Sequence, residues 1–169
     1  TTAKHPGVSR LKKSGNHFVT GDVTLVEPLS VSHRNFELNP LQTRLIFSHK
    51  GWTLIAGFST TEVAHRCHEA MLAKLFEETS VDGLFISPLY SLEESTEISY
   101  EAILASYQTL LEFGFFPQGQ VTLGSLSIGH RYADVRELMF RALCQKNMGC
   151  SHFLVTEEPG VNGNSDRRA

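Results

Sequence analysis

The most chemically suggestive feature of the sequence is a pair of histidines separated by two residues. His65 and His68 follow an apolar run of strand length, at a point where a helix is expected to begin. Residues at positions i and i+3 of a helix share one face, so both imidazole rings can reach one ligand. The free backbone N–H groups and the dipole of a helix N-terminus favour an anion at the same place. The pattern therefore predicts a phosphate-binding pair.

Two other interpretations of the pair stay open. A zinc site needs a third protein ligand, but Cys67 and Glu69 do not share a helix face with the two histidines. Acidic residues such as Glu62 and Glu94 could still contribute to a metal site, or hold Mg²⁺ through their carboxylate oxygens. The second interpretation is that both histidines are partly exposed and bind nothing.

Composition and charge exclude several classes of protein. The chain has 169 residues, which favours one domain. The net charge of −3 argues against a general nucleic-acid-binding protein, and no apolar run approaches the ~18 residues of a membrane span. The polar N-terminus does not resemble a signal peptide. The odd set Cys67, Cys144 and Cys150 has no paired spacing, so we expect reduced thiols and a cytoplasmic location.

Apolar runs and amphipathic stretches alternate along the chain. The runs predict strands at Trp52–Phe58, Gly83–Leu89, Gln120–Leu126 and His152–Glu157, and the periodic stretches predict helices from Pro40 to Lys50, Glu62–Glu78, Tyr100–Phe113 and Tyr132–Asn147. This alternation predicts an α/β fold with a parallel sheet and right-handed crossovers. Residues 1–30 are expected to be irregular, with short β structure around Phe18–Val19 and Val23–Val26.

Ligands of open α/β sheets bind beyond the carboxyl ends of the strands. That rule locates a candidate site without any other information. The loops concerned are Ser59–His68, Ser87–Glu97, Ser127–Arg136 and Thr156–Gly163. No P-loop and no G-x-S-x-G nucleophile motif occurs in the sequence.

Several blocks of the sequence resemble the catalytic domain of the ATP sulfurylase (sulfate adenylyltransferase) family, over most of the chain. GFSTTEVAHRCHEAM stands where that family has Phe-Gln-Thr-Arg-Asn-Pro-x-His-Arg-x-His-Glu. IGHRYADVRELMFRALCQKNMGCSHFLV stands where it has Met-Arg-Tyr-Ala-Gly-Pro-Arg-Glu, a helix, and Lys-Asn-x-Gly-Cys-Thr-His-Phe. HPGV and GNHFVTGDVTLVE resemble the end of its PUA-like domain.

The resemblance implies a domain division and a reaction. Residues 1–30 would be the end of a PUA-like β segment, 31–163 a Rossmann-like nucleotidyltransferase domain, and 164–169 a tail. The implied reaction transfers AMP from ATP, bound with Mg²⁺, to sulfate or a related oxyanion, giving adenylyl sulfate and pyrophosphate. Such an enzyme mainly positions its substrates and stabilises charge at phosphorus.

The resemblance also implies site residues. His65, His68 and Arg131 would be catalytic. The nucleotide would be bound by Phe58, Ser59, Thr60, Thr61, His65, His68, His130, Arg131, Tyr132, Ala133 and Val155.

The sequence departs from the family pattern at charged positions. Family arginines become Thr61 and Glu157, a lysine becomes Glu94, an asparagine becomes Glu62 and a histidine becomes Pro159. Such losses remove bidentate recognition of an oxyanion. They keep an alternative open, namely a catalytically degenerate domain that binds a nucleotide or acts as a regulatory or dimerisation module. Such a module could form a homo-oligomer or be fused to an adenylyl-sulfate kinase.

Overall fold

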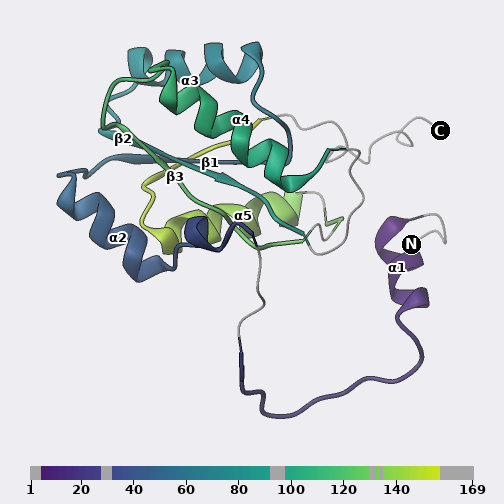
Figure 1. Cartoon of the computed structure of the whole chain (residues 1–169). Helices are drawn as coiled ribbons and strands as arrows, with labels where there is room; N and C mark the ends of the chain where they lie inside the picture. The colour runs from purple at the N-terminus through teal and green to yellow at the C-terminus, as the bar shows by residue number, and fades with distance from the viewer. Residues whose placement is uncertain (1–4, 28–31, 92–97, 130–131, 134, 157–169) are drawn as a thin grey trace.

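Strands β1 (Ile55–Thr60), β2 (Gly83–Pro88), β3 (Val121–Leu123) and β4 (His152–Leu154) form a parallel sheet in the order β3-β2-β1-β4. The structure is a computed structural model that describes residues 5–27, 32–91, 98–129, 132–133 and 135–156. The strands alternate with helices along the chain (Figure 1), which confirms the α/β fold with a parallel sheet.

Strand β1 pairs with two neighbours and is buried along its whole length. Its register sets Ile55 opposite Gly83 of β2, and Ala56 opposite His152 of β4. The strand begins three residues later than the apolar run predicts, because the carboxylate of Asp82 holds the backbone of Thr53 and Leu54 in a turn. It then continues through two polar residues to Thr60.

Helices cover both faces of the sheet. Figure 1 shows α3 (Arg66–Glu78) and α4 (Tyr100–Glu112) over one face, and α2 (Pro40–His49) and α5 (Val135–Met148) over the other. Side chains that alternate along the strands fill two cores. Phe58, Leu72, Leu84, Ile86 and Tyr107 belong to the first core, and Phe47, Trp52, Phe85 and Met148 to the second. None of the described helices combines the length and apolarity that crossing a membrane requires.

The predicted start of α2 is confirmed by its cap. The side chain of Asn39 accepts a hydrogen bond from the Gln42 backbone N–H at 2.9 Å, and the Gln42 side chain accepts one from the Asn39 N–H at 2.9 Å. This reciprocal capping box satisfies two of the N–H groups at the helix end. Pro40 occupies the first helical position, where it has no N–H to leave unpaired.

The N-terminal residues differ from the sequence-based expectation in two ways. A helix, α1 (Pro6–Lys13), forms where irregular chain was expected. The expected β structure around Phe18–Val19 and Val23–Val26 does not form, and these apolar side chains are 78–100% exposed. A strand needs a partner for its backbone hydrogen bonds, and Figure 1 shows this segment running apart from the sheet.

Two helices also start later than predicted. Helix α3 starts at Arg66 rather than Glu62, because the preceding residues form a turn fixed by side-chain hydrogen bonds. Helix α5 starts at Val135 rather than Tyr132, which has a positive φ of 53° that no helix can contain.

A buried amide joins α5 to the carboxyl ends of β1 and β2. Gln145 is fully buried, and its Nε2 donates to the hydroxyls of Ser59 at 2.5 Å and Ser87 at 2.6 Å. Its Oε1 accepts a hydrogen bond from the Cys150 thiol at 3.3 Å. Buried polar groups stabilise a fold only when all of them are paired. This network therefore fixes the position of α5 relative to the edge of the sheet at which ligands are expected.

We expect the substitution Gln145→Leu to lower the free energy of unfolding by about 1–3 kcal/mol, the cost of leaving buried partners unpaired. Urea denaturation followed by circular dichroism measures this loss. Gln118→Leu, in an exposed loop, is the matched control and should change stability little. A Gln145→Leu variant as stable as the control would show that the network does not stabilise the fold.

We expect Asp82→Asn to destabilise the protein in a pH-dependent way. A hydrogen bond from the backbone N–H of Leu54, and next those from the hydroxyl and backbone N–H of Thr53, lower the pKa of the Asp82 carboxyl. A group with a lowered pKa in the folded state stabilises it above the unfolded pKa of about 4. This contribution is lost as the pH falls through the folded-state pKa.

The difference in urea midpoint between wild type and Asp82→Asn should therefore be largest at neutral pH and shrink below about pH 4. Asp22→Asn, at an exposed position, is the control. A difference of constant size down to strongly acidic pH would contradict this role of the carboxylate.

Candidate functional site

The turn that follows β1 is held by side-chain hydrogen bonds at both ends. The hydroxyl of Thr60, the last residue of β1, accepts a hydrogen bond from the Glu62 backbone N–H at 3.0 Å. Further along, the Ala64 N–H donates to the hydroxyl of Ser106 on α4 at 2.8 Å. The turn therefore presents Glu62 and His65 from a fixed backbone at the carboxyl edge of the sheet.

His65 is the N-cap residue of α3 and does not lie within its first turn. Its backbone is extended, with φ −144° and ψ 170°, and its side chain makes no capping hydrogen bond. The His65 side chain therefore does not cap the N–H groups at the start of α3. The positive end of the helix dipole lies beside the imidazole ring of His65. The expectation that both histidines lie in the helix and share its face is corrected, because His65 precedes the first turn of α3.

His68 is the buried member of the pair. Its side chain is 8% exposed, whereas that of His65 is 43% exposed. The His68 Nδ1 lies 3.2 Å from the hydroxyl of Tyr107, and the ring packs on Phe58 with centroids 5.5 Å apart. Burial, and next the neighbouring His65, lower the pKa of His68, while Glu62 and a backbone hydrogen bond with Val63 act in the opposite direction.

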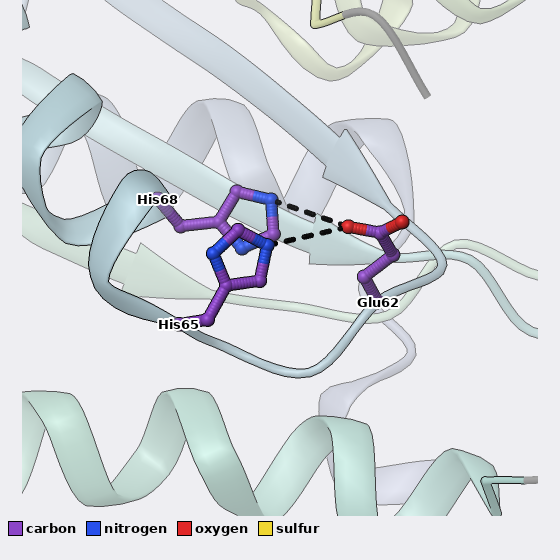
Figure 2. A group of neighbouring side chains, drawn as sticks. All are labelled: Glu62, His65 and His68. Carbon is purple, nitrogen blue, oxygen red and sulfur yellow. Dashed lines mark hydrogen bonds and ion pairs between the residues drawn. The ribbon is translucent and has the colours of Figure 1, made fainter. Parts of the chain in front are cut away.

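The two imidazole rings stack on each other and share an acidic neighbour. Their centroids are 3.8 Å apart and the ring planes differ by 27°. Oε2 of Glu62 lies 3.4 Å from Nε2 of His65 and 3.9 Å from Nε2 of His68, and Figure 2 shows both nitrogens directed at this oxygen. One ligand atom from each of the three residues lies within 4.8 Å of the others.

This arrangement can do two kinds of chemistry. Imidazole N–H groups beside a helix N-terminus can bind a phosphate group. Imidazole nitrogens beside a carboxylate can bind a metal ion. The sequence identified Glu62 only as one of several acidic residues that could help to bind a metal. It did not predict that Glu62 contacts both histidines. The contact depends on the conformation of the turn before α3, and a rule based on helical spacing does not apply to residues in a turn.

Other predicted nucleotide-binding residues lie at the end of β1. Phe58, Ser59 and Thr60 are buried in the strand. The Ser59 hydroxyl bonds to Gln145 and lies 3.1 Å from the Ser87 hydroxyl, so the side chain belongs to the interior network. Thr61 follows in the turn and is half-buried. Among these four residues, Thr61 therefore has the side chain most open to a ligand.

The remaining predicted residues lie on other elements or outside the description. Tyr132 and Ala133 precede α5, which covers the sheet face opposite α3, and Val155 follows β4 with its side chain exposed. The structure provides no description of His130, Arg131, Glu94, Glu157 or Pro159, which all lie outside the described residues. The predicted site is thus brought together at His65, His68 and the end of β1.

A second polar cluster was not anticipated from the sequence. His33 is buried between the rings of Tyr90 and Tyr100, and among the described residues its ring nitrogens have no hydrogen-bond partner. Glu37 lies 3.7 Å from its Nε2. Burial raises the pKa of Tyr100 to about 12, and its hydroxyl donates to Ser125 at 2.6 Å. No spacing rule connects His33 with Tyr90 and Tyr100, which lie far from it in the chain.

Comparison with known proteins gives consistent matches over most of the chain. Residues 34–164 match the family model of ATP-sulfurylase. The chain is 36% identical to a sulfate adenylyltransferase of Synechococcus over 97% of its length, and 33% identical to one of Pyrococcus abyssi over 96%. It is 39% identical over 90% of its length to one of Trichormus variabilis. The chain covers 38–42% of the length of these relatives.

A solved structure supports the fold. The chain superposes on a hexameric APS kinase from Thiobacillus denitrificans with a TM-score of 0.65 and 23% identity, covering 80% of this chain and 27% of the other. At that identity the likeness concerns the fold alone. The family match extends over the sheet, its helices and the two stacked histidines. The chain therefore belongs to the ATP-sulfurylase family.

Proposed function

We propose that this chain is the nucleotide-binding part of an ATP sulfurylase-type nucleotidyltransferase. The observation that carries the proposal is the stacked pair His65 and His68 at the N-terminus of α3, beyond the carboxyl end of β1. Ligands of parallel α/β sheets bind at this edge, and a helix N-terminus favours phosphate. ATP is the proposed nucleotide, with a divalent cation that we propose to be Mg²⁺.

The proposed reaction joins sulfate, or a related oxyanion, to the α-phosphorus of ATP. A bond forms between an oxygen of the acceptor and phosphorus, and the bond from phosphorus to the departing pyrophosphate breaks. His65 and His68 would contact the phosphates, and Arg131 would act beside the nucleotide. Holding the phosphates in one orientation lowers the entropic barrier to an in-line displacement.

A second candidate is a domain that binds the nucleotide without efficient transfer. The carboxylate of Glu62 favours it, because this charge lies 3.4 and 3.9 Å from the imidazole nitrogens proposed to bind phosphate. Such a domain would serve as a regulatory or dimerisation module, in a homo-oligomer or in a fusion with an adenylyl-sulfate kinase.

The domain division follows from the same proposal. Residues 31–163 would form the nucleotidyltransferase domain, which the family match over residues 34–164 supports. Residues 1–30 would be the end of a PUA-like segment and 164–169 a tail. We also propose a cytoplasmic location, because Cys67, Cys144 and Cys150 are all free thiols.

We expect His65→Ala to weaken the binding of ATP with Mg²⁺ about tenfold or more, since a hydrogen bond to a charged group contributes ~1.5–3 kcal/mol. Calorimetry measures this affinity. His65 is the cleaner test, because His68 also packs on Tyr107 and Phe58 and its removal costs stability. His49→Ala, at the exposed end of α2, is the matched control.

Equal ATP affinity in His65→Ala and wild type would overturn the phosphate role. Pyrophosphate release, measured on the same samples with and without sulfate, separates the two candidates. Sulfate-dependent release supports the enzyme. Tight ATP binding without release supports the regulatory domain.

A further inference from the structure

Glu62, His65 and His68 together have the ligand set of a metal site. Each residue offers one ligand atom, and the three atoms lie within 4.8 Å of one another. The backbone that carries them is fixed, because Thr60 and Ser106 hold the turn and α3 holds His68. The hydrogen bond between Nδ1 of His68 and Tyr107 orients the ring so that Nε2 is directed at Glu62, as Figure 2 shows.

The distances are longer than those of a short direct ion pair and are compatible with a bound ion. A charge-assisted hydrogen bond between nitrogen and carboxylate oxygen is about 2.7–2.9 Å long, whereas the two distances here are 3.4 and 3.9 Å. Two ligands bound at ~2.1 Å to a tetrahedral ion lie about 3.4 Å apart. The pair Glu62–His65 already has this spacing, and the pair Glu62–His68 needs a movement of about half an ångström by the half-exposed carboxylate.

The chemistry of the ligands selects the kind of ion. Imidazole nitrogens suit zinc and its neighbours in the transition series, whereas Mg²⁺ prefers oxygen ligands and retains its water molecules. We propose that Glu62, His65 and His68 form a three-ligand site for a transition-metal ion of the Zn²⁺ type. Three protein ligands leave one tetrahedral position open, as in sites where zinc binds water or substrate.

The ion accounts for the acidic group at this position. A carboxylate beside the proposed phosphate position repels the nucleotide when it is unpaired. A divalent cation held by one carboxylate and two neutral imidazoles leaves the site with a net positive charge. In this state Nε2 of each histidine binds the ion, and the phosphate is bound through the ion, with one of its oxygens in the open position. This last step rests on the proposed function, whereas binding of the metal itself does not.

The first experiment is a titration of the chelator-treated full chain with Zn²⁺ by calorimetry, and with Co²⁺ by visible absorption. We expect one ion per chain, with the intense absorption bands of tetrahedral Co²⁺. Glu62→Gln and His65→Ala should each weaken Zn²⁺ binding by at least about tenfold, the loss typical of even an outer-shell partner. Both side chains are partly exposed, so both variants should fold, which circular dichroism checks.

Cys67→Ser and His49→Ala are the matched controls and should bind Zn²⁺ like wild type. Cys67 is exposed and adjacent to His68, so it is the most plausible competing ligand. Absence of stoichiometric binding, unchanged binding in Glu62→Gln and His65→Ala, or loss of binding in Cys67→Ser would each overturn the metal site. These outcomes decide the metal site alone, and the proposed ATP binding is decided by its own measurement with Mg²⁺.

The second experiment tests the open position with inorganic phosphate. Adding orthophosphate to the Co²⁺-loaded chain should change the absorption bands if a phosphate oxygen enters the coordination sphere. Unchanged bands would overturn the phosphate-accepting position and leave the three-ligand site standing. If ATP with Mg²⁺ binds neither the metal-free nor the Zn²⁺-loaded chain while Zn²⁺ still binds, the proposed function fails and the metal site remains.

Discussion

The parallel pairing of β1 with strands on both sides is the constraint on which the other features depend. Because β1 bonds to β2 and β4 and is covered on both faces, its length and register are fixed. Parallel strands end at the same edge, so the turn after Thr60 emerges at the edge where ligands of such sheets bind. Gln145 and Asp82 reinforce opposite ends of this arrangement.

The site combines groups with opposing electrostatic preferences. The N-terminus of α3 and two imidazoles favour an anion, and the carboxylate of Glu62 favours a cation. A side chain that repels the expected ligand is costly unless another charge compensates for it. A bound cation resolves this conflict and makes the acidic substitution compatible with phosphate binding. Without a bound cation, the carboxylate of Glu62 would repel the phosphates and would lower any transfer activity.

The order of strands and helices could be predicted because it depends on local patterns. Continuous apolar runs indicate doubly buried strands, and the capping residues Asn39 and Pro40 mark a helix start. The helix at Pro6–Lys13 and the unpaired segment around Phe18 were not predicted correctly. An alternating apolar pattern predicts a strand, but a strand forms only where a partner lies beside it.

The sequence by itself determined the parallel α/β fold, the family and the proximity of His65 and His68, because these follow from periodicity, block resemblance and spacing. Tertiary structure decided that Glu62 joins the pair, because a turn held by Thr60 and Ser106 brings its carboxylate back onto the rings. It also decided that His68 is buried against Tyr107, a residue of another helix. Contacts between residues distant in the chain depend on how the layers pack, which no local pattern encodes.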